Sequence, residues 1–246
     1  MRTIRSGTAI GLRLGSGAWT QDGLLVAIRR SGAQQYFIDD AQAFTETAEA
    51  LGHEARIVNV ALDSNLAVSA MSDAIAAGAD GIAIAVPEGS LGPSIAAAAA
   101  EAGVPLVATA ISIADGAGNP VPFVGFDGLA MGEAVGDGAA GLLLESGWLE
   151  GGSCGLLNVE LSTLAVCTDR TNATTARLVA AGAAEESVVV VPYDGTTDSA
   201  LSATGPILTA HPDVDHWVVY SCNDDGVLGA LNALRNAGFA ASDVIG

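Results

Sequence analysis

The feature that most constrains the fold is an alternation of short apolar runs with longer alanine-rich stretches, which begins at Leu24. The short runs are rich in valine, isoleucine and leucine, as expected of strands in a parallel sheet. The longer stretches have helical apolar spacing, and several are followed by glycine, which tolerates the left-handed conformation that ends many helices. This order predicts an α/β protein with parallel sheets.

The alternation can be divided into individual elements. The expected strands are Leu24–Ile28, Arg56–Val60, Gly81–Ala85, Leu106–Thr109, Pro122–Phe126, Gly155–Val159, Val188–Val191, His216–Ser221 and Val244–Ile245. The expected helices are Ile38–Leu51, Leu66–Ala77, Pro93–Ala102, Ala130–Leu144, Thr171–Ala181, Ser199–Ala210 and Asp225–Ala237. With 246 residues and 50% hydrophobic content, the chain is long enough for two lobes with separate cores.

One glycine-rich stretch, Ile113–Asn119, interrupts the alternation and has no apolar period. We interpret it as the connection between two Rossmann-like lobes. The chain then divides into a leader at 1–23, a first lobe at 24–112, a crossover or hinge at 113–121 and a second lobe at 122–246. The leader lacks the continuous apolar run of a signal peptide, so we expect it to be poorly ordered or to be the wrong start of a longer precursor. No apolar run elsewhere is long enough to insert into a membrane.

The charge of the chain argues against nucleic-acid binding. The formal net charge is −19, from 28 acidic and 9 basic residues, and every basic residue is an arginine. Binding to a phosphate backbone requires clustered basic side chains, whereas these arginines are scattered along the chain. We therefore expect no nucleic-acid partner.

The residues that follow the strands are the candidates for a site, because ligands bind beyond the carboxyl ends of strands in open α/β sheets. Most of them are hydrogen-bonding groups, with a few aromatic rings: Arg29, Arg30, Gln34, Tyr36, Pro87, Glu88, Ser90, Phe126, Asp127, Glu160, Thr168, Asp169, Arg170, Asn172, Asn223 and Asp224. Such a set suits a polyhydroxylated ligand, which needs planar hydrogen-bonding groups and an aromatic platform. The alternative is structural: Asp127, Thr168 and Asn223 could each only cap a helix, and Arg170 could pair with Asp169.

No arrangement of residues indicates catalysis, a cofactor or a metal. The three histidines, His53, His211 and His216, fall at turns or at the amino end of a strand, away from the expected site. Asp224 and Asp225 adjoin a helix start, where the helix dipole favours carboxylates. The three cysteines, Cys154, Cys167 and Cys222, show no spacing typical of zinc or of a disulfide framework, so we expect small buried hydrophobic side chains.

The sequence also contains a match to the dinucleotide-binding motif. Gly136, Gly138 and Gly141 form G-x-G-x-x-G, with Glu160 about 20 residues further on. The glycines fall about ten residues after Phe126, inside a helical pattern, so they cannot form the turn that meets a pyrophosphate. We interpret them as small residues that allow close packing.

Several blocks resemble bacterial L-arabinose-binding proteins and, more widely, the type 1 periplasmic sugar-binding proteins of ABC transporters. The most specific block is HPDVDHWVVYSCNDDGVLGALNALRNAGFAASDVIG, and others are IAAGADGIAIAVPEGSLGPSIAAAAAEAGVPLVAT, VPFVGFDGLAMGEAVG and DRTNATTARLVAAG. The resemblance extends from about Leu24 to Gly246. It implies the two-lobed type 1 fold, incomplete at the C-terminus, because family members continue past Gly246.

The resemblance also implies a set of ligand-binding residues. Arg30 takes the place of a lysine that reaches the sugar, and Tyr36 that of a stacking tryptophan. Phe126 replaces an apolar methionine, and Arg170 matches the arginine that donates to the ring oxygen. The pair Cys222 and Asn223 matches a methionine–asparagine pair, of which the asparagine binds a hydroxyl. One family residue has no counterpart: the aspartate after the fourth strand, where this chain has Ala110.

These expectations together favour an extracytoplasmic solute-binding protein that captures an arabinose-like monosaccharide between two lobes and delivers it to an ABC transporter permease. The resemblance implies a periplasmic or extracellular location, with any membrane anchor in a precursor segment. It implies no catalytic residue, cofactor or metal. The alternative is the ligand-sensing domain of a transcription repressor or of a chemotaxis or sensor system, which shares the fold; residues 1–23 are too short and glycine-rich for a DNA-binding head.

Overall fold

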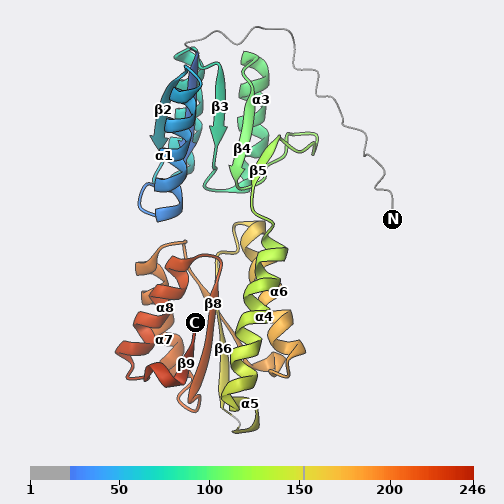
Figure 1. Ribbon diagram of the computed structural model, residues 1–246, viewed down its shortest axis with the longest axis vertical. Helices are drawn as coiled ribbons and strands as arrows, with labels where there is room; N and C mark the ends of the chain where they lie inside the picture. Colours follow the sequence, from blue (N-terminus) through green and yellow to red (C-terminus); the bar gives the residue numbers. More distant parts are fainter. Residues whose placement is uncertain (1–22, 152) are drawn as a thin grey trace, which may run out of the picture.

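The computed structural model describes residues 23–151 and 153–246 as two lobes, each with a parallel sheet between helices (Figure 1). The α/β class and the two-lobed arrangement are therefore confirmed. The expected leader at residues 1–23 lies outside the described residues, except for Gly23. Within the described ranges, none of the helices combines the length and the apolarity needed to cross a membrane.

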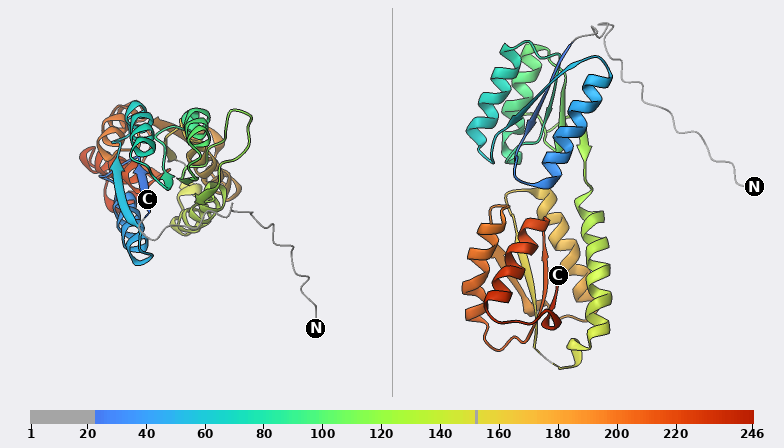
Figure 2. Two further views of the ribbon diagram at one scale, coloured as in Figure 1. Left: turned by 90° about the horizontal axis from the view of Figure 1, so that it is seen from above. Right: turned by 60° about the vertical axis from the view of Figure 1, so that its left-hand side comes forward.

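The first lobe contains a five-stranded sheet in the order β2-β1-β3-β4-β5, in which all pairings are parallel. Its strands are β1 (Leu24–Arg29), β2 (Glu54–Asn59), β3 (Gly81–Ile84), β4 (Leu106–Ala110) and β5 (Phe123–Gly125). Its helices are α1 (Gln35–Ala50), α2 (Ser64–Ala76) and α3 (Gly92–Ala102), with the 3₁₀ turn η1 (Gly89–Leu91). Helix α1 covers one face of the sheet, and α2 and α3 cover the other (Figure 2).

The second lobe contains a four-stranded parallel sheet in the order β7-β6-β8-β9. Its strands are β6 (Cys154–Glu160), β7 (Val188–Pro192), β8 (His216–Ser221) and β9 (Val244–Ile245). Its helices are α4 (Gly128–Ser146), α5 (Trp148–Gly151), α6 (Ala165–Ala180), α7 (Thr197–Ala210) and α8 (Asp224–Asn236), with the 3₁₀ turns η2 (Glu185–Ser187) and η3 (Ala241–Asp243). Helices α4 and α6 lie on one side of this sheet, and α7 and α8 on the other (Figure 1).

The expected boundary between the lobes is wrong by one strand. Strand β5 pairs with β4, with Phe123 opposite Ala108, so it belongs to the sheet of the first lobe. The glycine-rich stretch at 113–121 lies between β4 and β5 and is therefore a loop within that lobe. The Asp115 carboxylate holds the loop by accepting hydrogen bonds from the backbone N–H groups of Ala117 and Asn119, at 2.9 and 2.8 Å. Among the described residues, the chain passes between the lobes after Gly125, just before α4 (Figure 1).

Helix α6 begins at Ala165, six residues before the expected start at Thr171. The residue before the helix is Leu164, whose side chain makes no capping hydrogen bond. The sequence therefore contains no N-cap signal at this point. Thr168, expected as a possible cap, lies inside the helix and donates from its hydroxyl to the carbonyl of Ala165 at 2.9 Å.

A stripe of glycines on α4 allows this helix to pack closely on α6. A Cβ atom on Gly132 would overlap the carbonyl oxygen of Arg170, and one on Gly136 would lie 2.6 Å from Cβ of Arg177. The Thr174 hydroxyl donates to the carbonyl of Gly132 at 3.0 Å, a contact that requires this closeness. Of the G-x-G-x-x-G motif, only Gly136 serves in packing; Gly138 and Gly141 have open space around them.

This packing leads to a prediction for Gly132→Ala. The added methyl group has no room against α6, so the free energy of unfolding should fall by about 1–3 kcal/mol. The matched control is Gly138→Ala on the same helix, which meets nothing within 4 Å and should stabilise by about 0.5–1 kcal/mol through helix propensity. Urea denaturation of both variants measures the difference. Equal effects of the two substitutions would contradict close packing at Gly132.

Candidate ligand-binding site

A cavity of about 430 Å³ lies between the lobes and is lined by residues from both. All six residues expected to bind the ligand line it: Arg30, Tyr36, Phe126, Arg170, Cys222 and Asn223. They come from the end of β1, the start of α1, the connection between the lobes, α6 and the turn between β8 and α8. The carboxyl ends of the parallel strands in each sheet thus face one shared space, as expected for this class of fold.

Aromatic rings form one part of the cavity wall. The ring centroid of Tyr36 lies 5.0 Å from that of Phe126, with the planes tilted by 59°, and 4.9 Å from that of Phe37 in an edge-on contact. Tyr36 is 42% exposed, so a large part of its surface remains free for contact with a ligand. Aromatic faces of this kind pack against the C–H faces of sugar rings.

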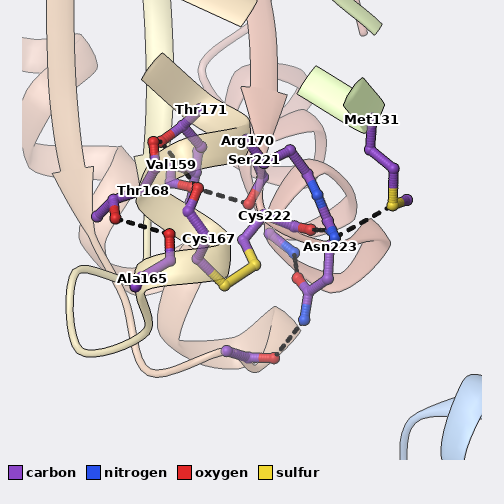
Figure 3. The surroundings of a disulfide bond; sticks show 12 residues. Met131, Val159, Ala165, Cys167, Thr168, Arg170, Thr171, Ser221, Cys222 and Asn223 are labelled. Atoms are coloured by element: carbon purple, nitrogen blue, oxygen red, sulfur yellow. Dashed lines mark hydrogen bonds between the residues drawn. A yellow bond between two sulfur atoms is a disulfide. The ribbon is translucent and has the colours of Figure 1, made fainter. Parts of the chain in front are cut away.

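Arg170 reaches across the second lobe toward the turn after β8. Its guanidinium donates to the carbonyl oxygen of Cys222 and lies 3.4 Å from the sulfur of Met131 (Figure 3). It also lies over the ring of Phe126, 5.8 Å from the centroid. Burial lowers the pKa of the Arg170 guanidinium, and nearby Tyr193 and Asp224 offset this effect only in part. The expected alternative, an ion pair with Asp169, is wrong, because these two side chains form no salt bridge in the structure.

Asn223 caps helix α8, as the structural alternative predicted. Its Oδ1 atom accepts hydrogen bonds from the backbone N–H of Gly226 at 3.0 Å and from the hydroxyl of Tyr193 at 2.8 Å. Its Nδ2 atom donates to the carbonyl of Gly195 at 3.1 Å, which leaves one amide hydrogen for a ligand. Asp127 caps helix α4 in the same way, by accepting from the N–H of Ala130 at 3.0 Å.

Arg30 is the most buried charged group of the cavity wall. It is 7% exposed, and its Nε atom has no hydrogen-bond partner among the described residues. Burial lowers the pKa of this guanidinium as well, and the opposing influence comes from Tyr193 rather than from a carboxylate. A guanidinium stays protonated in proteins, so Arg30 holds a positive charge that forms no salt bridge with any described carboxylate.

Gln34 makes a contact between the lobes. Nothing in the sequence distinguished this residue from the others that follow strands. Its side-chain Nε2 atom donates to the carbonyl of Gly195 in the second lobe at 2.8 Å. Gly195 therefore accepts from Gln34 and Asn223 at once. Long-range contacts of this kind leave no local signal in a sequence, because their partners are 161 residues apart.

The interpretation of the cysteines is wrong for two of the three. Cys167 and Cys222 form a disulfide, with Cα atoms 4.8 Å apart (Figure 3). The bond joins the first turn of α6 to the end of β8, and both cysteines line the cavity. Their separation of 55 residues hid the pairing, since only the fold brings these two positions together. Cys222 therefore faces the cavity as half of a disulfide.

The remaining cysteine and the histidines lie away from the cavity. Cys154 is a free, half-buried cysteine, and burial raises its pKa to about 11. The imidazole of His216 stacks on Trp148 with ring centroids 4.4 Å apart, and His211 ends helix α7. Among the described residues, no group of three or more His, Cys, Asp or Glu side chains could hold a metal ion.

A family model of the periplasmic binding protein domain matches residues 25–246, nearly all of the described chain. The protein belongs to this family. It is similar to the ABC transporter L-arabinose-binding periplasmic protein of Azospirillum brasilense, with 33% identity over 222 residues, which cover 87% of this chain and 64% of the relative. It is 29% identical over 201 residues to the L-arabinose-binding periplasmic protein of Escherichia coli K12, covering 80% of this chain and 60% of that relative. The binding protein thus spans less than two thirds of the length of these two relatives.

Solved structures of solute-binding proteins share the fold. A solute-binding protein of Actinobacillus succinogenes with bound D-allose superposes with a TM-score of 0.74 at 20% identity, covering 91% of this chain and 77% of that one. The myo-inositol binding protein of Caulobacter gives the same TM-score at 24% identity and covers 90% and 72% of the two chains. At these identities the likeness extends to the fold alone.

Proposed function

We propose that this periplasmic binding protein captures a monosaccharide between its lobes and presents it to the permease of an ABC transporter outside the cytoplasm. The observation that carries the proposal is the cavity between the lobes, in which all six residues implied by the sugar-binding resemblance meet. The L-arabinose-binding relatives support it at the level of ligand class. Binding, without any catalytic step, is the proposed activity.

The proposed mechanism is closure of the two lobes on the ligand. Arg30 and Tyr36 belong to the first lobe, and Arg170 and Asn223 to the second, so a ligand in the cavity contacts both. Contacts that exist only when both lobes surround the ligand favour the closed state by the difference in binding free energy between closed and open forms. The permease would then recognise the closed form.

A thermal-shift experiment tests this function. A panel of pentoses, hexoses and sugar acids is added to the wild-type protein, and a bound sugar should raise its melting temperature. A ligand present at 100 times its Kd adds about 2.7 kcal/mol to the free energy of unfolding. If compounds other than carbohydrates raise the melting temperature and no carbohydrate does, the proposed ligand class is wrong.

The matched variants are Arg170→Ala and Arg235→Ala. Arg170→Ala should abolish the rise in melting temperature, because it removes charged donors from the cavity wall. Arg235 is an exposed residue of α8 that bonds Asn232 at 2.7 Å, and its loss should leave the rise intact. Equal ligand-induced shifts in the melting temperatures of the two variants would show that Arg170 does not bind the ligand.

A further inference from the structure

Two guanidinium groups line the cavity, and neither forms a salt bridge with a carboxylate of the described chain. Arg30 is more than nine-tenths buried, and its Nε atom has no hydrogen-bond partner among residues 23–151 and 153–246. Within the same ranges, Arg170 also has a buried Nε atom without a partner, and its guanidinium donates to the carbonyl of Cys222 and the sulfur of Met131. Within the described residues, neither positive charge is therefore neutralised by a salt bridge, and the carboxylate of Asp224 influences Arg170 only from beyond salt-bridge distance.

Elsewhere in the described chain, arginines do find carboxylates. Arg29, which directly precedes Arg30 and is 2% exposed, pairs with Asp40. Arg56 pairs with Glu54, and Arg177 pairs with both Glu133 and Asp137. Arg235 forms no salt bridge but is exposed, so water solvates its charge. In a chain with a net charge of −19, acidic partners are abundant, so the lack of a salt bridge at the two cavity arginines, within the described residues, is a property of this site.

The first-lobe wall of the cavity contributes no acid. At the positions nearest the strand ends it presents the neutral side chains of Gln34 and Ala110. A buried charge without a partner is unfavourable unless a ligand supplies the opposite charge. A neutral sugar offers only hydroxyl acceptors to the two guanidiniums, whereas a carboxylate offers two oxygens that match the planar fork of an arginine.

The acids in the cavity wall are Asp224 and Asp225, at the start of α8. Asp225 accepts a hydrogen bond from the Thr197 hydroxyl at 2.9 Å, and Asp224 is exposed. The positive end of the helix dipole stabilises carboxylates in this first turn, so they do not need the arginines as partners. Their negative charges would repel a phosphate dianion more strongly than a single carboxylate, so of these two anions the carboxylate is the better fit.

We propose that the ligand is a monosaccharide acid, with its carboxylate at Arg30 and Arg170 and its ring on the aromatic surface of Tyr36 and Phe126. This inference rests on the proposed function and narrows its ligand class from monosaccharides to carboxylated ones. The acid group would take the place of the carboxylate that the protein does not provide. Uronates are the simplest members of this class, because they keep the sugar ring.

Matched ligands test the inference directly. L-Arabinose, D-galactose and D-galacturonate have the same arrangement of ring hydroxyls and differ only in the group at C5, which is hydrogen, hydroxymethyl or carboxylate. D-Xylose, D-glucose and D-glucuronate form a second such series. Isothermal titration calorimetry of the wild-type protein should show that one uronate binds at least about tenfold more tightly than both neutral members of its series.

A variant that adds an acid to the cavity should reverse this preference. Ala110 lines the cavity and has φ of 59°, a left-handed conformation that aspartate tolerates better than most residues. Ala110→Asp should therefore weaken uronate binding at least about tenfold and strengthen binding of the neutral sugars. The control is Ala97→Asp, which adds the same charge to the exposed surface of α3 and should change neither affinity.

The outcomes separate the two proposals. Tighter binding of a uronate, lost in Ala110→Asp and kept in Ala97→Asp, supports the monosaccharide acid. Binding of a neutral sugar as tightly as its uronate, or more tightly, overturns the inference while the proposed sugar-binding function stands. Binding of neither neutral sugars nor uronates overturns both. The wild-type comparison alone decides if Ala110→Asp does not fold, which a circular-dichroism spectrum would reveal.

Discussion

Replacement of Arg30 by methionine should raise the melting temperature of the ligand-free protein while it weakens ligand binding by about 10–150-fold. Both effects follow from the burial of an unpaired charge, since Arg30 is 7% exposed and forms no salt bridge within the part of the chain that the structure describes. Replacement of such a charge by an apolar side chain of similar volume raises the free energy of unfolding by about 1–3 kcal/mol. Loss of a charged hydrogen bond to the ligand costs about 1.5–3 kcal/mol, which corresponds to the stated range.

Urea denaturation of the ligand-free wild type and of Arg30→Met measures the change in stability. Isothermal titration calorimetry with the ligand found in the thermal-shift panel measures the change in affinity. Arg235→Met is the control, because Arg235 is exposed and its loss should change stability by no more than about 0.5 kcal/mol. Replacement of a residue that serves only the fold would instead lower the stability of the ligand-free protein. If Arg30→Met destabilises the ligand-free protein, Arg30 has a structural role and its place in the ligand site loses support.

The second large effect is expected from the disulfide. The double substitution Cys167→Ala and Cys222→Ala should lower the free energy of unfolding by about 4 kcal/mol, because the bond closes a loop across 55 residues of sequence. Ligand affinity should fall as well. The bond holds the start of α6 against the turn after β8, the two segments that position Arg170 and Asn223 (Figure 3).

Urea denaturation of the double variant and of wild-type protein with and without a thiol reductant measures this effect. The reduced wild type should behave like the double variant, and Cys154→Ala serves as the control for loss of a cysteine outside the bond. A thiol reagent in denaturant counts the free cysteines: unreduced wild type should label at Cys154 alone, and reduced wild type at all three cysteines. Labelling of three thiols in unreduced, denatured protein would show that the bond is absent.

Much of the fold follows from local patterns. Each expected strand is found close to its expected position, because valine- and isoleucine-rich runs flanked by glycine carry a strong signal. The lobe boundary was misplaced because a glycine-rich loop looks the same in sequence whether it joins two lobes or two strands of one sheet. Only the pairing of β5 with β4 distinguishes these cases, and strand pairing is a long-range property.

The site shows the same division between local and long-range information. Resemblance to a family placed Arg30, Tyr36 and Arg170 at the cavity, since these positions belong to recognisable blocks. The cap that Asn223 forms on α8 was among the expected alternatives, whereas its bond to Gly195, the disulfide and the contact of Gln34 with Gly195 were not expected. Each joins residues from separate elements, and composition or spacing along the chain gives no measure of their distance in space.

The hydrogen bond from Gln34 to Gly195 adds an affinity between the lobes that is independent of any sugar. Under the proposed function, such a contact would let the protein populate a closed state without ligand. Empty closed molecules would compete with loaded ones for the permease, so transport at low solute concentration would depend on the ratio of the two forms. The same contact would slow the escape of a captured solute. In the proposed transport function, the single amide of Gln34 would thus increase retention of the ligand and also increase unproductive docking of empty protein at the transporter.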